Sequence, residues 1–224
     1  MFTPHFMTGV DKAHATGFNS KGIKIAIINT GIDSSLGGGF GPSHKVIGGY
    51  DFVGDACVPP PTLTRNQHSS MFFCDRRYDG TNTPAPDNNP MDNCNGHGTH
   101  VAGIIGANPG NAYKILGIAP SASILAYRIF GCKGTVTDNL IIKALLRSID
   151  DQADIATLSL GSVDGWTSSS AAVVASRIAS TGKVVTIAAG NDGNYGSWYT
   201  SSPGSGLDVI SVASVEKCVA FSPR

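Results

Sequence analysis

The residues best suited to chemistry in this 224-residue chain lie around His97, in the string Asn95-Gly96-His97-Gly98-Thr99-His100. The two flanking glycines let the backbone turn tightly at the start of a helix and leave the imidazole facing the cleft. A histidine held in this way can take the proton of a serine, provided that a carboxylate orients it and donors stabilise the oxyanion. A site of this kind therefore needs three further groups from elsewhere in the chain.

Apolar strands alternate with amphipathic helices along the sequence. We predict strands over residues 22–29, 123–129, 155–160, 184–189 and 208–213, and helices over 97–107, 138–150 and 168–180. Asp138 can cap the second of these helices. The alternation predicts an α/β fold with a doubly wound parallel sheet and helices on both faces. Because ligands bind beyond the carboxyl ends of such strands, Asn29 and Asn191 are expected at the active edge.

Residues 95–103 resemble the histidine motif of the subtilisin-like serine proteases, the subtilases. Residues 26–33 resemble the strand-end Asp-Thr-Gly motif of this family, with Asn29 in place of the aspartate, and residues 188–193 resemble its oxyanion-hole segment. The resemblance implies that His97 is the general base, Asn29 its altered orienting group and Asn191 the oxyanion donor. An asparagine carries no charge, and its NH2 group can present a donor where an acceptor is needed. Such a replacement in another serine protease lowers kcat by about 10⁴-fold.

The nucleophile motif of the family, Gly-Thr-Ser followed by an apolar residue and Ala, has no counterpart in the sequence. The serines within residues 166–172 precede Asn191, whereas the family's nucleophile follows the oxyanion segment. We therefore expect a truncated, catalytically degenerate protease domain that lacks the central nucleophile helix and is inactive as written. The alternative is a pseudoprotease that binds extended peptides or a proteinaceous inhibitor. A small-molecule α/β enzyme is disfavoured, because the glycine run at 37–41 lacks the spacing of a dinucleotide loop.

Two loops resemble the substrate walls of the family, which pair with an extended polypeptide as an added strand. The residues concerned are Gly131, Lys133, Gly134, Ser159, Leu160 and Gly161. Nucleic acid is not an expected partner, because 16 basic residues balance 16 acidic ones. We expect a monomer. Apolar runs too short for a bilayer exclude a membrane span.

The family resemblance covers residues 9–216 and is closest to the minor-extracellular-protease-like group of fungi and oomycetes, which implies an extracellular protein. Neither a signal peptide nor a propeptide is recognisable in this chain. Residues 57–77 are Pro-rich and unlike their surroundings, and 217–224 lose the strand rhythm. Because Cys-Val stands at residues 57–58 and again at 218–219, and residues 56 and 78 would join smoothly, we interpret the two segments as an aberrant insertion and tail, each a translated intron.

No cofactor is expected, and calcium enters only by analogy with the family. The carboxylates that were considered form no recognisable site: Asp33, Asp51, Asp55, Asp87 and Asp92. His97 and His100 lie one helical turn apart, but no Glu or Cys ligand completes a zinc site. The five cysteines, Cys57, Cys74, Cys94, Cys132 and Cys218, are odd in number. In a secreted protein, at least one thiol would stay unpaired.

Overall fold

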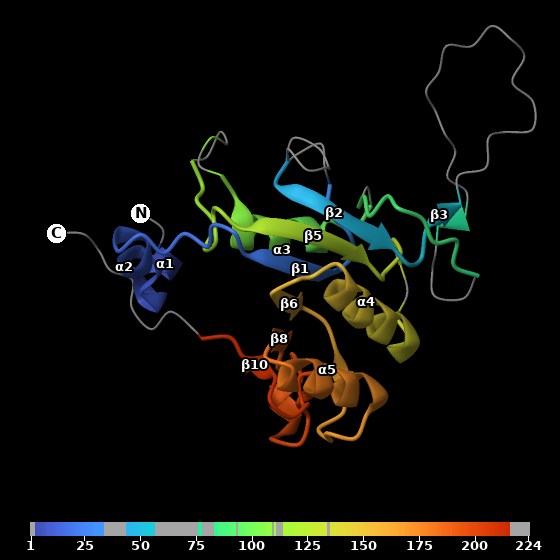
Figure 1. The fold of residues 1–224 in the computed structure, drawn as a ribbon. Helices are drawn as coiled ribbons and strands as arrows, with labels where there is room; N and C mark the ends of the chain where they lie inside the picture. Colours follow the sequence, from blue (N-terminus) through green and yellow to red (C-terminus); the bar gives the residue numbers. More distant parts are fainter. Residues whose placement is uncertain are drawn as a thin grey trace, which may run out of the picture. The chain divides into compact units, whose positions relative to one another are not determined.

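The computed structural model describes residues 3–33, 44–56, 76–77, 83–92, 94–108, 110, 114–133 and 135–215. The chain divides into two compact units, one ending at Ser159 and the other beginning at Leu160. Each unit has its own strands and helices (Figure 1). Within the described residues, no helix is both long and apolar enough to cross a lipid bilayer.

A parallel sheet forms the centre of the first unit. Its strands are β1 (Lys24–Asn29), β2 (Val46–Asp51), β5 (Ser123–Arg128) and β6 (Ile155–Leu158). They lie in the order β6-β1-β5-β2, and each neighbouring pair is parallel. Five of the six residues of β1 are buried, as expected for a strand whose sheet is covered on both faces. The register places Asn29 beside Arg128, so the last residues of β1 and β5 share one edge.

Helices cover both faces of this sheet. α3 (His97–Gly106) and α4 (Asp138–Asp150) lie on opposite sides of β1 in Figure 1. Ile25 and Ile27 pack in one core cluster with Ala102 of α3. The inner face of α4 is made of Leu140, Ile141, Ala144, Leu145 and Ser148. Each large aliphatic side chain buried in this way contributes roughly 1.5–3 kcal/mol, which fixes β1 between the two helices.

The first unit also contains short elements outside this sheet. The helices α1 (Thr3–Thr8) and α2 (Val10–Ala15) begin the described chain. β3 (Asp55–Ala56) pairs antiparallel with β4 (Arg76–Arg77). β4 is the only part of the predicted insertion, residues 57–77, that falls within the described residues, and the predicted tail, 217–224, lies outside them.

The second unit repeats the strand-and-helix arrangement on a smaller scale. β8 (Val184–Ala188) pairs in parallel with β10 (Ile210–Val212), and β7 (Ser162–Val163) pairs antiparallel with β9 (Ser201–Ser202). α5 (Ser170–Ser180) buries the side chains of Ala171, Ala172, Ala175 and Ile178. A single 3-10 turn, η1 (Gly193–Tyr195), follows β8.

The fold confirms the predicted parallel α/β sheet and corrects several details. β2 was not predicted, because two glycines interrupt its apolar pattern; at Gly49 a Cβ atom would collide with the Ala126 carbonyl of β5. The N-cap of α4 is Thr137, not Asp138, which is the first helical residue. α5 begins two residues later than predicted, because the Ser169 side chain accepts the Ala172 N–H as its cap.

Candidate active site

The structure brings two of the predicted site residues into contact. Asn29 is the last residue of β1 and is 1% exposed, whereas His97 is exposed at the first position of α3. His97 Nδ1 lies 2.7 Å from Asn29 Oδ1. β1 therefore places the Asn29 amide beside Nδ1 of the imidazole. This contact lies at the carboxyl edge of the sheet, where α/β proteins bind their ligands.

The Asn29 amide turns its oxygen, not its NH2 group, toward the imidazole. The backbone N–H of Thr30 donates to the same oxygen over 2.9 Å. A flipped amide would set its NH2 group against this N–H donor, so the observed orientation is the favourable one. His97 Nδ1 is then the protonated nitrogen, and Nε2 keeps the lone pair that a general base requires.

The other end of the same amide is poorly accommodated. Asn29 Nδ2 is buried and has no hydrogen-bond partner among the residues that the structure describes. A buried donor without a partner costs about 1–3 kcal/mol. Asparagine thus reproduces the acceptor that orients His97, but it carries no charge and leaves its second polar atom unsatisfied.

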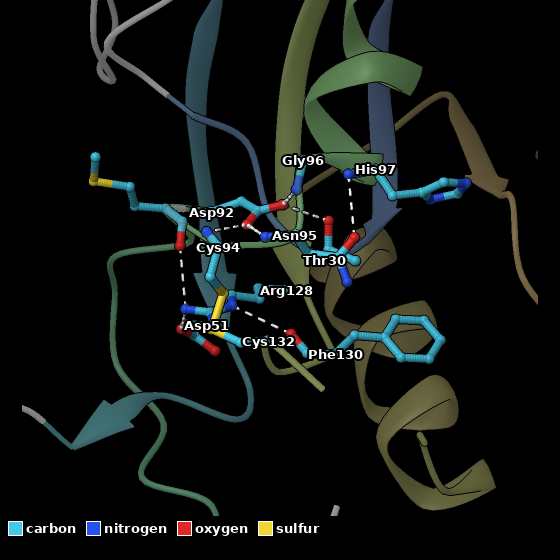
Figure 2. The surroundings of a disulfide bond; sticks show 11 residues. Thr30, Asp51, Asp92, Cys94, Asn95, Gly96, His97, Arg128, Phe130 and Cys132 are labelled. Atoms are coloured by element: carbon cyan, nitrogen blue, oxygen red, sulfur yellow. Dashed lines mark hydrogen bonds and ion pairs between the residues drawn. A yellow bond between two sulfur atoms is a disulfide. The ribbon is translucent and has the colours of Figure 1, made fainter. Parts of the chain in front are cut away.

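A buried carboxylate holds the turn in front of His97 (Figure 2). Asp92 is 2% exposed, and its Oδ1 accepts the backbone N–H groups of Cys94 at 3.0 Å and Asn95 at 2.8 Å. Its Oδ2 accepts the Gly96 N–H at 2.7 Å and the Thr30 hydroxyl at 2.6 Å. Burial works against ionisation, but these four donors outweigh it and hold the pKa of Asp92 below its ordinary value.

The Thr30 hydroxyl extends this network to the other side of His97. Its oxygen accepts the Gly98 N–H at 2.8 Å while its proton goes to Asp92. Gly96 caps α3 with a φ of 84°, which favours glycine. At Gly98 a Cβ atom would collide with the Gly31 carbonyl oxygen. Gly96 is therefore required by its backbone conformation, and Gly98 by its close approach to the Gly31 carbonyl.

A buried ion pair lies at the end of β5. Arg128 Nη1 is 3.1 Å from Asp51 Oδ2 and also donates to the Met91 carbonyl at 3.1 Å. Asp51 Oδ1 accepts the N–H groups of Val53 and Gly54. Burial raises the pKa of Asp51 to about 6, although the Gly54 hydrogen bond and the Arg128 charge oppose the rise.

A disulfide between Cys94 and Cys132 joins the turn before His97 to the loop after β5, with Cα atoms 5.3 Å apart (Figure 2). The same loop carries two predicted wall residues, Gly131, which is buried, and Lys133, which is exposed. The other three cysteines, and the predicted wall residue Gly134, lie outside the described residues. Ser159, half-buried, ends the first unit.

The remaining predicted residues belong to the second unit. Asn191 is exposed in the turn after β8, next to Gly190, whose φ is 102°. Leu160 is 8% exposed, and Gly161 is exposed. A Cβ atom on Gly161 would collide with the Ser201 hydroxyl, so a close approach of two backbones explains the glycine.

Comparison with known proteins shows the family to which the chain belongs. A sequence model of the Subtilase family matches residues 20–223. The chain belongs to the subtilase family. Minor extracellular protease Vpr of Bacillus subtilis (strain 168) is 36% identical over 213 residues, which cover 93% of this chain and 22% of that protein. Subtilisin E of the same strain is 33% identical over 187 residues, 84% of this chain and 39% of its own length.

Thermitase of Thermoactinomyces vulgaris is 34% identical to this subtilase over 199 residues, 88% of this chain and 56% of thermitase. The chain thus spans between about a fifth and just over half of the length of these relatives.

Sequence reasoning missed the supporting residues of this subtilase site: Thr30, Asp51, Asp92, Arg128 and the disulfide. One of them had a readable signal. An aspartate followed by asparagine and glycine within four residues is typical of a side chain that accepts nearby backbone N–H groups, as Asp92 does. The buried Arg128 had none, because its partners come from distant parts of the chain.

The described residues contain no group of three or more His, Cys, Asp or Glu side chains that could hold a metal ion. Two of the carboxylates considered for calcium have other partners. Asp51 accepts from Arg128, and Asp92 accepts from the turn before His97. Asp51 and Asp92 are therefore already engaged within the described part of the chain.

Proposed function

We propose that this chain contributes the histidine-bearing part of a subtilisin-like serine endopeptidase domain, and that these 224 residues by themselves do not cleave peptides. The observation that carries the proposal is the 2.7 Å contact between His97 Nδ1 and Asn29 Oδ1. It sets the imidazole in the tautomer that a general base needs. The proteases named among the relatives support the same reaction class.

The expected inactivity has two physical reasons. Acyl transfer needs a serine within hydrogen-bond reach of His97 Nε2, and the sequence contains no Gly-Thr-Ser motif. In addition, the neutral Asn29 amide cannot stabilise the imidazolium that forms when the base takes a proton. Asn191 would donate to an oxyanion, a contribution of roughly 3 kcal/mol, but only once a nucleophile has attacked.

A second candidate function is that of a pseudoprotease, which binds extended peptides or a proteinaceous inhibitor without chemistry. The geometry around Asn29 favours it, because the site keeps its hydrogen-bonded architecture while the charge is lost. The ligand would be an extended polypeptide that pairs with the backbone at Gly131–Lys133 or at Ser159–Gly161. The relative Vpr, a minor extracellular protease, supports an extracellular location.

Fluorescence anisotropy with a labelled, unstructured peptide tests binding. We expect saturable binding, and at least tenfold weaker binding of a peptide whose alternate backbone nitrogens are methylated and cannot join a strand. A fluorophosphonate probe on the same sample tests catalysis. Labelling of a serine, or peptide cleavage that is lost in His97→Ala, would contradict the proposed inactivity. Equal affinity for the methylated peptide would contradict strand-like binding.

A further inference from the structure

The disulfide of this chain lies against a buried positive charge. Arg128 Nη2 is 3.8 Å from Cys94 Sγ and 3.9 Å from Cys132 Sγ. Arg128 is 1% exposed, and its other terminal nitrogen, Nη1, bonds Asp51 and the Met91 carbonyl. Figure 2 shows the guanidinium beside the S–S bond. The guanidinium is therefore held in place whatever the state of the sulfurs.

A neighbouring guanidinium favours thiol–disulfide exchange. It stabilises a thiolate relative to a thiol, and a sulfur that leaves as a stabilised thiolate leaves faster. Both cysteines are half-buried, and Cys94 is among the residues that line an open surface cavity of about 490 Å³, from which a reagent can approach it.

We propose that Cys94–Cys132 is a reversible exchange site for a protein dithiol, and that its redox state sets how firmly the turn before His97 is held. A thiolate of the dithiol attacks one sulfur, the S–S bond breaks, and the other cysteine departs as a thiolate beside Arg128. The second thiol of the reductant then attacks the mixed disulfide and releases the remaining cysteine. The two electrons come from the dithiol, which ends as a disulfide, and its two protons pass to solvent or to the released sulfurs.

Arg128 is not the only charged group in the region of the disulfide. Asp51 forms an ion pair with the same guanidinium, but it accepts from Nη1, whereas Nη2 is the nitrogen beside the sulfurs. Asp92 accepts the backbone N–H of Cys94, and its oxygens accept four donors in all. Lys133 follows Cys132 and is exposed. Arg128 is the charged group that faces both sulfurs directly.

Reduction has a defined structural consequence. Cys94 is the first of three successive residues whose N–H groups bond Asp92, and Gly96 ends that run immediately before His97. With the S–S bond intact, this turn is tied to the loop after β5. Without it, the turn is held by hydrogen bonds such as those to Asp92, so it opens more often.

Two measurements on the whole chain test the proposal, and neither depends on peptide binding or activity. After reduction with dithiothreitol, the rate of iodoacetamide alkylation is followed from pH 5 to 9, and peptide mass spectrometry reads Cys94 and Cys132 separately. We expect at least one of the two thiols to titrate a full unit below the ordinary thiol pKa of about 8.5. Hydrogen exchange of the peptide spanning residues 94–98 should rise at least threefold on reduction and return on reoxidation.

Arg128→Lys keeps a positive charge but loses the fork that reaches both sulfurs, and we expect its thiols to titrate closer to the ordinary value. If this variant does not fold, the thiol titration and the hydrogen exchange of the native chain still test the proposal. Two thiols titrating at or above about 8.5 in the native chain would overturn the proposal, as would unchanged exchange in residues 94–98.

Discussion

The turn before His97 and the turn that carries Asn191 are held very differently. In the first, Asp92 is buried and collects three backbone N–H groups and a hydroxyl. In the second, Asn191 is exposed, and its side chain has no hydrogen bond among the described residues. Backbone bonds such as Ser201 N–H to the Ala189 carbonyl support that segment instead.

The difference shows where the preorganisation of this domain resides. The base must present one nitrogen in one tautomer, so both neighbours of His97 are fixed through Asp92 and Thr30. An oxyanion donor acts only on a substrate, and its NH2 group has to stay available. Stability should therefore be concentrated in the polar network of the first turn and be nearly independent of the second.

The largest expected effect is that of Asp92→Ala. The substitution leaves the N–H groups of Cys94, Asn95 and Gly96 and the buried Thr30 hydroxyl without their acceptor, and a donor without a partner costs about 1–3 kcal/mol where water cannot reach it. We expect a loss of at least about 3 kcal/mol in the free energy of unfolding, measured by urea denaturation.

Asn191→Ala is the matched control for the second turn. Because this side chain is exposed, its removal should change the free energy of unfolding by less than about 0.5 kcal/mol. Equal losses of unfolding free energy in Asp92→Ala and Asn191→Ala would contradict the proposed difference between the two turns.

The second expected effect is a pH dependence of the free energy of unfolding, which originates at Asp51. Its folded-state pKa is raised to about 6, so the folded state holds the proton more tightly than the unfolded state between about pH 4 and 6. The stabilisation from Asp51 is therefore fully present below pH 4 and is lost as the pH rises through 6, by at most about 3 kcal/mol. Asp92 acts oppositely, since its lowered pKa gives stability that is lost only at acid pH.

Urea denaturation between pH 4 and 7 measures this slope. Asp51→Asn should remove the Asp51 part of it whatever the absolute stability of the variant, whereas Asp138→Asn, at an exposed position, should leave it unchanged. An unchanged slope in Asp51→Asn would show that the buried ion pair does not titrate in this range.

A smaller effect compares two helix starts. The Ser169 side chain accepts the Ala172 N–H at the start of α5, whereas Thr137 caps α4 without a side-chain hydrogen bond. Ser169→Ala should therefore cost about 1 kcal/mol and Thr137→Ala less than about 0.5 kcal/mol by urea denaturation. A larger loss in Thr137→Ala than in Ser169→Ala would contradict the comparison of the two helix starts.

Local patterns explain what was predictable from the sequence. The apolar run ending at Asn29 and the helical period after Asp138 predicted β1 and α4 with their burial, because each follows from neighbouring residues. β2 was missed, because its glycines serve a close approach to β5 that sequence spacing does not reveal. The family motifs led to His97 and Asn29, and the structure places them in contact.

The long-range contacts of the supporting network could not be predicted from the sequence, for a different reason. Arg128 meets Asp51 across 77 positions in the sequence, and Thr30 meets Asp92 across 62. Such contacts depend on strand order and register rather than on local periodicity. The amide orientation of Asn29 was equally hidden, because it is set by a single N–H group of the next residue.

The most direct test of the account is the tautomer of His97, read from ¹⁵N chemical shifts of the imidazole in the neutral form. The contact with Asn29 Oδ1 predicts a protonated Nδ1 and a bare Nε2 in the native chain, and a mixture of tautomers in Asn29→Ala. A native spectrum with the proton on Nε2 would mean that the Asn29 NH2 group faces the ring. His97 would then not be held as a general base.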